Sequence, residues 1–162
     1  MSGKAVQSAG ARFFIATGAS ATTLCTTQAA YEALTYVEVE EIEDIGAFGS
    51  THEKVTYKTL SDGAVHKRKG TVDHGSLTIK LARIPTAVGQ AAVKAARKDR
   101  KNGYCVKITL DDAPEDGTPT TVYAFAYVLS YTFEIGSNDK IVEATVNIEI
   151  DAEPIEVAAA ED

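Results

Sequence analysis

The sequence has little of the material on which several protein classes depend. Its 162 residues include two cysteines, one methionine, four prolines and no tryptophan. No apolar run approaches the roughly 18 residues of a membrane-spanning helix, and the N-terminus lacks the apolar centre of a signal peptide. We therefore expect a soluble, unsecreted protein without membrane insertion. In such a protein Cys25 and Cys105, which form no CxxC motif, are favoured as a buried reduced pair over a disulfide.

Signatures of catalysis and of metal binding are also missing. The chain contains no GxSxG elbow, Walker loop, GxGxxG or HExxH motif. The three histidines, His52, His66 and His74, fit no familiar zinc spacing and lie near no cysteine in the sequence. We therefore expect surface histidines, no metal or other cofactor, no catalytic residues and no enzymatic activity.

Acidic residues cluster in one place, where Glu38, Glu40, Glu41, Glu43 and Asp44 follow one another closely. Carboxylates that converge can perform acid–base chemistry or bind calcium. The cluster lacks the glycine-turned, Asp/Asn-rich calcium loop, and it falls in the alternating segment 34–45, which predicts a strand. A strand spreads its carboxylates along a line, so a solvated acidic face is favoured over a site.

The overall charge argues against tight binding of nucleic acid. The formal net charge is −7, and the basic residues are grouped in the segments 67–69 and 94–101. A domain that grips nucleic acid usually carries excess positive charge on one face. A surface past which DNA merely moves is still compatible with this charge.

The centre of the chain, residues 70–109, predicts one helix between two strands. Apolar residues alternate in segment 77–81, Thr86 is a plausible N-cap, and the helix is expected to continue to Lys101 before Asn102-Gly103. Strand 104–110 follows. The helix face expected to lie against a sheet consists of Val88, Ala91, Ala92 and Ala95.

Two long antiparallel strands are predicted around the turn 136–139. In strand 121–135 one face carries an aromatic stripe, which is favoured as core over a base-stacking platform. In strand 141–150 the apolar residues face inward. The stripe consists of Tyr123, Phe125, Tyr127, Leu129, Tyr131, Phe133 and Ile135, and the inward set of Val142, Ala144, Val146, Ile148 and Ile150.

Residues 46–71 are polar and glycine-bearing, and we expect them to form a long hairpin or loop that projects from the core, with its turn at Ser61-Asp62-Gly63. The Lys67-Arg68-Lys69 triplet fits either a contact with phosphate or an acidic partner, or simply a solvated turn. The length predicts a single domain, 1–162, with a flexible N-terminal tail, 1–11, and an acidic C-terminal tail, 154–162.

The order of these segments resembles that of a known family. The residues that carry the resemblance are Val37-Glu38-Val39 before Ile42-Glu43-Asp44-Ile45-Gly46, then segment 69–75 (KGTVDHG), Gly89-Gln90-Ala91-Ala92 at the helix entry, and the paired strands from Thr121 and Ile141. This order is similar to that of the major tail tube proteins of long non-contractile-tailed bacteriophages. That family shares its fold with contractile-tail tubes and with the tube of the type VI secretion system.

The resemblance implies a mainly β protein: an antiparallel β-sandwich or barrel-like tail-tube fold with one flanking α-helix and a long projecting hairpin loop. It implies a structural virion protein of the tail, made in the host bacterial cytoplasm. Copies would close into hexameric rings that stack into a tube for genome delivery. The implied partners are further copies of the chain, tape-measure, tail terminator and distal tail proteins, and phage DNA that passes through the lumen non-specifically.

Two sets of residues are candidates for these roles. Polar faces of the two long strands are candidates for the lumen wall, with an outer solvated face as the alternative, and the projecting segment is the candidate for an arm between rings. The lumen set is Ser130, Thr132, Glu134, Glu143, Thr145, Asn147 and Glu149. The arm set is His52, Lys54, Tyr57, Asp62, His66, Lys67, Arg68 and Lys69.

Two other hypotheses are open at this point. The chain could be a small β-rich binding module or secretion-linked adaptor without polymerisation, which predicts a stable small species with a concave site. A hydrolase with an unrecognised site is the weakest alternative, because no residue can be named for it.

Overall fold

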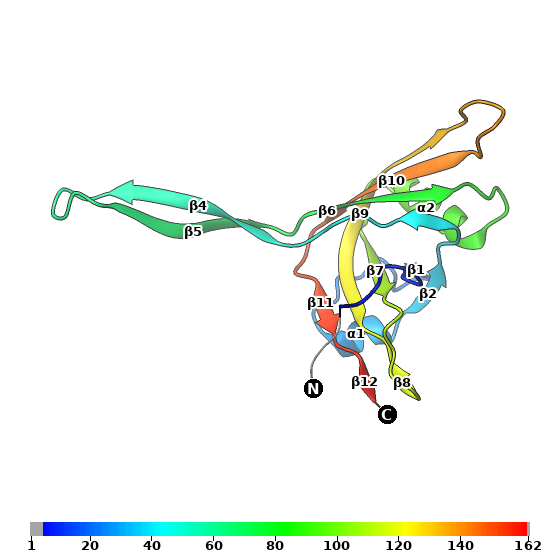
Figure 1. Ribbon diagram of the computed structural model, residues 1–162, viewed down its shortest axis with the longest axis horizontal. Coiled ribbons are helices and arrows are strands. Elements are labelled where there is room, and N and C mark those ends of the chain that lie inside the picture. Colours follow the sequence, from blue (N-terminus) through cyan, green and yellow to red (C-terminus); the bar gives the residue numbers. More distant parts are fainter. Residues whose placement is uncertain (1–4, 162) are drawn as a thin grey trace.

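The computed structural model describes residues 5–161 and shows an antiparallel sheet from which one hairpin projects (Figure 1). The large sheet has the strand order β2-β1-β7-β9-β10-β6-β3, with β11 paired to β9, while β4–β5 and β8–β12 form separate pairs. The bounds are β1 Arg12–Thr17, α1 Gln28–Glu32, β2 Thr35–Glu38, β3 Ile42–Asp44, β4 Thr51–Lys58, β5 Val65–Asp73, β6 Ser76–Ala82, α2 Val88–Lys98, β7 Tyr104–Thr109, β8 Gly117–Thr118, β9 Thr121–Glu134, β10 Glu143–Ile150, β11 Ile155–Val157 and β12 Ala160–Glu161.

The main core lies between one face of the sheet and helix α2. Strand β6 contributes Leu77, Ile79 and Leu81, and α2 contributes Val93 and Ala96, all almost fully buried. The alternation of apolar residues in β6 and β10 places them on this face, as the sequence predicts. The expected fold class, mainly β and antiparallel with a flanking helix and a projecting hairpin, is confirmed.

A smaller apolar cluster lies on the opposite face of the sheet, beneath the short helix α1. Tyr31 of α1 stacks on Tyr123 of β9 with ring centroids 5.4 Å apart. Cys25 and Cys105 are free, buried thiols with their sulfurs 3.9 Å apart. Burial, followed by the neighbouring Cys25, raises the pKa of the Cys105 thiol to about 12. The favoured reduced pair is therefore what the structure contains.

Helix α2 differs from its expected position and orientation. It follows Ala87 and ends at Lys98, so Thr86 is not the N-cap. The buried residues include Gly89 and Gln90, whereas Val88 is exposed. A Cβ on Gly89 would lie 1.9 Å from the Glu38 carbonyl oxygen. This close approach fixes which side of the helix faces the sheet. Of the expected face, Ala92 packs against the main core, whereas Val88, Ala91 and Ala95 are exposed, so the prediction is wrong for these three.

The single strand predicted over residues 34–45 is two strands, β2 and β3, at opposite edges of the sheet. Between them Val39 donates its N–H to the carbonyl of Phe13, and the carbonyl of Glu41 accepts from Ala82. Glu41 has a φ of 57°, a left-handed conformation that ends the extended run. The chain therefore crosses from one edge of the sheet to the other, which gives the sheet its barrel-like closure.

The aromatic stripe expected on strand β9 is also divided. A register shift between Asn147 and Ile148 of β10 places Leu129 of β9 in a bulge. Before it, Tyr123 and Phe125 pack under α1; beyond it, Tyr131 packs against the main core. A bulge adds one residue and so exchanges the two faces of the strand. The prediction that all seven residues share a buried face is wrong, since Tyr127, Leu129, Phe133 and Ile135 are exposed.

The two terminal segments differ in how far the structure describes them. Residues 1–4 of the predicted N-terminal tail lie outside the described residues, and Ala11 donates its N–H to Ser8 in a turn before β1. In the C-terminal segment β11 pairs with β9, and β12 pairs with β8. None of the helices within residues 5–161 has the length and apolarity needed to cross a membrane.

Candidate functional site

The hairpin formed by β4 and β5 extends far beyond the sheet (Figure 1). Every residue of β4 is exposed, and in β5 only His66 and Gly70 are partly covered. The two strands are held by their own ladder, with a register shift near the base between His52 and Lys54. A two-stranded ribbon of this kind gains little from the core, so its side chains are available to another surface.

The pairing register divides the hairpin into two unlike faces. On one face Tyr57 stacks on His66 with ring centroids 5.1 Å apart, and the Arg68 guanidinium lies 5.9 Å from the Tyr57 ring. The opposite face, from its register, carries a row of lysines. These are Lys54, Lys58, Lys67 and Lys69.

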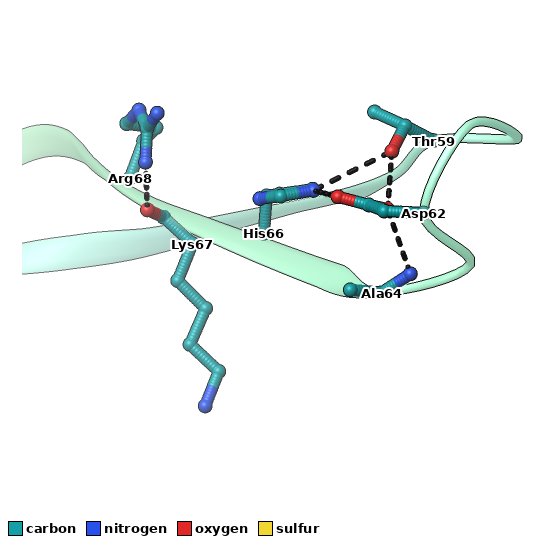
Figure 2. A network of polar contacts seen from close by, with 6 residues as sticks. All are labelled: Thr59, Asp62, Ala64, His66, Lys67 and Arg68. Carbon is teal, nitrogen blue, oxygen red and sulfur yellow. Dashed lines mark hydrogen bonds and ion pairs between the residues drawn. The ribbon is translucent and has the colours of Figure 1, made fainter.

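The tip of the hairpin is organised around the Asp62 carboxylate (Figure 2). Its Oδ1 accepts from the Thr59 hydroxyl at 2.6 Å and from the Ala64 N–H at 2.9 Å, and its Oδ2 lies 2.7 Å from His66 Nε2. The hydrogen bond from Thr59, with those from Ala64 and His66, holds the pKa of Asp62 below its usual range. The loop 59–64 thus has a defined shape although it is exposed.

At the base of the hairpin, Ser50, His74 and Glu153 meet. His74 Nδ1 lies 3.2 Å from Ser50 Oγ and 3.1 Å from Glu153 Oε2. In a nucleophilic triad the serine and the acid contact different ring nitrogens of the histidine. One nitrogen accepts the proton of the serine hydroxyl, while the N–H of the other donates to the acid and orients the ring. Here both face the same nitrogen, so the group lacks the triad geometry; it ties the base of the hairpin to the segment that follows β10.

A tight backbone contact supplements this tie. Gly75 has a φ of +91°, and a Cβ there would lie 2.5 Å from the carbonyl oxygen of Gly49. The two segments of the chain that enter and leave the hairpin therefore approach each other closely at Gly49 and Gly75, where neither residue has a side chain. This contact brings the chain back from the hairpin into strand β6.

The arm candidates are brought together in part. Tyr57, Asp62, His66 and Arg68 form a continuous group at and near the tip, whereas Lys54, Lys67 and Lys69 belong to the opposite face. His52 lies at the base, opposite Val72. The arm set expected from the sequence does not include Lys58, Thr59 or Leu60. All three lie next to the turn signal at the end of an alternating segment, and this position could have indicated them.

The seven lumen candidates lie on one face of the sheet, opposite the main core. In register, Thr132 lies opposite Thr145, Glu134 opposite Glu143, and Ser130 opposite Asn147. The Asn147 amide donates to Ser130 Oγ at 2.9 Å, and Thr78 of β6 donates to Asn147 Oδ1 at 3.1 Å. The face therefore continues onto β6 through Ser76, Thr78 and Lys80, which the sequence analysis missed although the alternation of β6 marks them.

Charge is distributed unevenly between the hairpin and the rest of the chain. Residues 51–73 carry five basic and three acidic side chains, a net charge of +2, against −7 for the whole chain and therefore −9 for the remainder. On the polar face of the sheet, Glu134, Glu143 and Glu149 outnumber the single cation Lys80. The hairpin and the remainder of the chain therefore carry opposite net charges.

A pocket of about 410 Å³ with a mixed apolar and polar lining opens beside the edge strand β3. Ile42, Ile45, Phe48, Ile108 and Leu110 line it, together with Glu43, Asp44 and residues 8–11. No cluster of three His, Cys, Asp or Glu side chains suited to a metal ion occurs between residues 5 and 161. The polar groups around the pocket form no catalytic arrangement.

The arrangement of the sheet, helix α2 and the projecting hairpin is shared with several solved structures. The chain matches no family model and no curated protein. Among solved structures it is similar to a chain of the anti-feeding prophage baseplate, with 16% identity, 98% coverage of both chains and a TM-score of 0.67. A chain of the PVC sheath/tube terminator, from an extracellular contractile injection system, has 10% identity, coverage of 96% and 99%, and a TM-score of 0.68.

The SPP1 tail tube protein is similar as well, with 12% identity over 98% of this chain and 81% of that one and a TM-score of 0.65. At these identities the likeness establishes the fold. This chain therefore has the fold of phage tail tubes and contractile injection system tubes, and the fold that the sequence resemblance implies is confirmed.

Proposed function

We propose that this protein is a structural subunit whose copies assemble into the tube of a phage tail. The observation that carries the proposal is the tail-tube fold, matched over 98% of both chains, in a molecule whose hairpin packs on nothing of its own (Figure 1). Copies close into hexameric rings, and the rings stack. The anti-feeding prophage structure is described as 6-fold symmetrised, which supports this ring size.

In this proposal the polar face of β9, β10 and β6 lines the lumen. Apart from Lys80, its polar side chains are hydroxyls, an amide and carboxylates, which do not attract phosphate. A surface with more acids than bases keeps DNA from adhering, because affinity for the backbone comes mainly from neutralised phosphates. The genome then passes through the lumen without being held.

The β4–β5 hairpin acts as the arm between neighbouring rings. Val55, Tyr57, Leu60, Val65 and Val72 are exposed along it, an unusual concentration of apolar surface for a ribbon without core contacts. Docking on the next ring covers these side chains. The arm thus joins rings along the tube axis through a heterologous contact, which can repeat without limit.

The setting we propose is the virion of a phage with a long non-contractile tail, with synthesis of the protein in the bacterial cytoplasm. Tape-measure, tail terminator and distal tail proteins are the expected partners at the ends and inside of the tube. The TM-scores with the anti-feeding prophage chain and with the SPP1 tail tube are nearly the same, 0.67 and 0.65, so they do not distinguish the two settings. The proposal of a non-contractile tail therefore rests on the order of the sequence segments.

The test is negative-stain electron microscopy of the purified protein over a concentration series, with light scattering on eluted size-exclusion fractions. We expect hollow rings or tubes of uniform diameter that grow with concentration. A protein that stays monomeric when concentrated and when seeded with tail fragments contradicts the proposal.

A second experiment separates stacking from ring formation. Residues 51–73 are replaced by a two-glycine link, which removes no residue of either apolar cluster. We expect this variant to form rings that do not stack, with thermal unfolding of the monomer close to that of the unchanged protein. Tubes of normal length from the shortened chain would exclude the hairpin as the arm.

A further inference from the structure

We propose that the pocket beside β3 receives the hairpin tip of a second copy of this chain, with Leu60 as the inserted side chain. The inference rests on the proposed function and deepens it, because it names the surface on which the arm docks. It joins two features at different places in the molecule: a pocket that no side chain of residues 5–161 fills, and a leucine that none of these residues covers.

The pocket has the size and lining for an aliphatic side chain with part of its loop. Its volume is about 410 Å³, and Ile42, Ile45, Phe48 and Ile108 form its apolar lining. Ile42, Ile45 and Phe48 are only partly buried, so their remaining surface faces the opening. Filling it removes apolar surface from water on both copies.

The tip supplies a fitting occupant. Leu60 is the most exposed large apolar side chain of the described chain, at full exposure. The loop that carries it is ordered, because Asp62 holds Thr59, Ala64 and His66 in one network (Figure 2). A side chain on a preorganised loop loses little conformational freedom when it docks.

Charge gives the contact its direction. Glu43 and Asp44 lie at the pocket, on an acidic body, whereas on the hairpin Lys58 lies two residues before Leu60, and Lys67, opposite Thr56, follows on the same face. Opposite charges around an apolar centre orient the two surfaces and exclude the reversed arrangement. The contact must come from another copy, because the hairpin of the same chain points away from its own body (Figure 1).

A cross-linking experiment tests the contact directly. Full-length Leu60→Cys and Glu43→Cys proteins are mixed, assembled and treated with a short bismaleimide; the native Cys25 and Cys105 are buried. We expect covalent dimers that link Leu60→Cys to Glu43→Cys in the mixture, and none when either protein is treated alone. The matched control pairs Leu60→Cys with Thr132→Cys on the polar face of the sheet, and here dimers should be at least tenfold fewer.

A second set of variants tests side chain and charge without cross-linking. We expect Leu60→Ser to raise the protein concentration needed for tubes about tenfold, and Leu24→Ser, another exposed leucine, to leave it unchanged. Glu43→Lys and Lys58→Glu should each impair stacking, and an equal mixture of the two proteins should regain it in part, because the charges are then opposite in half of the contacts.

The outcomes separate this inference from the proposed function. Tubes that form normally, with no Leu60–Glu43 dimers and no effect of Leu60→Ser, overturn the pocket and leave the tube intact. Absence of any polymer overturns the proposed function, and absence of dimers in the same samples overturns the pocket with it. Saturable binding of a small apolar molecule that survives in the assembled protein would assign the pocket to a ligand instead.

Discussion

The two long hairpins of the molecule, β4–β5 and β9–β10, are built from similar alternating sequences and have opposite surroundings. Strand β10 buries every second residue against α2 and its neighbours, whereas β4 buries none. In β10 the apolar residues stabilise the monomer; in the β4–β5 hairpin they face water. Alternation of apolar and polar residues therefore indicates that a strand has two unlike faces. It does not indicate that the apolar face is covered by the same chain.

The largest expected effect comes from a matched pair of leucines on the two sides of this comparison. Leu77 in β6 is 1% exposed and Leu60 fully exposed. We expect Leu77→Ala to lower the free energy of unfolding of the dilute monomer by about 3 kcal/mol, from lost burial and the remaining cavity. Leu60→Ala should change it by less than about 0.5 kcal/mol, as at other surface positions. Urea denaturation measures both, and equal losses would mean that the tip packs on its own domain.

A smaller loss of stability is expected when the buried hydrogen bonds of Gln90, which hold helix α2 to the large sheet, are removed. Gln90 is 1% exposed; it accepts the Ile84 N–H at 2.9 Å and donates to the carbonyls of Ala82 and Glu40 at 2.9 and 3.1 Å. Gln90→Leu leaves these backbone groups unpaired, and we expect about 2 kcal/mol less stability by thermal and urea unfolding.

The control for this variant is Gln28→Leu, since Gln28 makes one exposed hydrogen bond with Glu32 in α1. Its loss should be about 0.3 kcal/mol, the usual value for a helix-surface pair. If the two substitutions cost the same, α2 is not held to the edge of the sheet through Gln90.

The smallest effect concerns the hairpin tip and its pH dependence. The pKa of Asp62 is lowered in the folded protein by the bonds from Thr59, Ala64 and His66. Its contribution is therefore fully present above the unfolded pKa of about 3.9 and is lost as the pH falls through the lower folded value. We expect the protection of the Ala64 amide, taken relative to an unstructured amide at the same pH, to fall below about pH 4, while the global unfolding over that interval is set by other groups.

Asp62→Ala should produce the same local loosening at neutral pH, with the melting temperature unchanged. Amide exchange by NMR measures it, and Asp139→Ala in the turn after β9 serves as the control. An Ala64 amide that keeps its protection in Asp62→Ala would show that the tip is ordered by backbone pairing alone.

Much of the fold could be predicted because its strands alternate strictly. The core faces of β6 and β10, the hairpin with its turn at Asp62-Gly63 and the shared face of the seven polar candidates all follow from that pattern. The division of segment 34–45 could not, because it depends on contacts with Phe13 and Ala82, which are distant in sequence. The buried face of helix α2 could not be predicted for a similar reason. Its orientation follows from the contact between Gly89 and Glu38 rather than from its own apolar spacing.

The bulge at Leu129 has a consequence for how such a sequence can change. Because Leu129 is the one extra residue between the two halves of β9, removal of its codon would let Ser130 follow Val128 directly, still opposite Asn147, and would leave the polar wall and the core face as they are. Removal of one codon beyond the bulge, such as that of Thr132, would instead bring Phe133 opposite Thr145 and turn the end of the strand over. Two deletions three codons apart would thus differ in outcome, because the first removes a residue without a partner and the second shifts an entire surface.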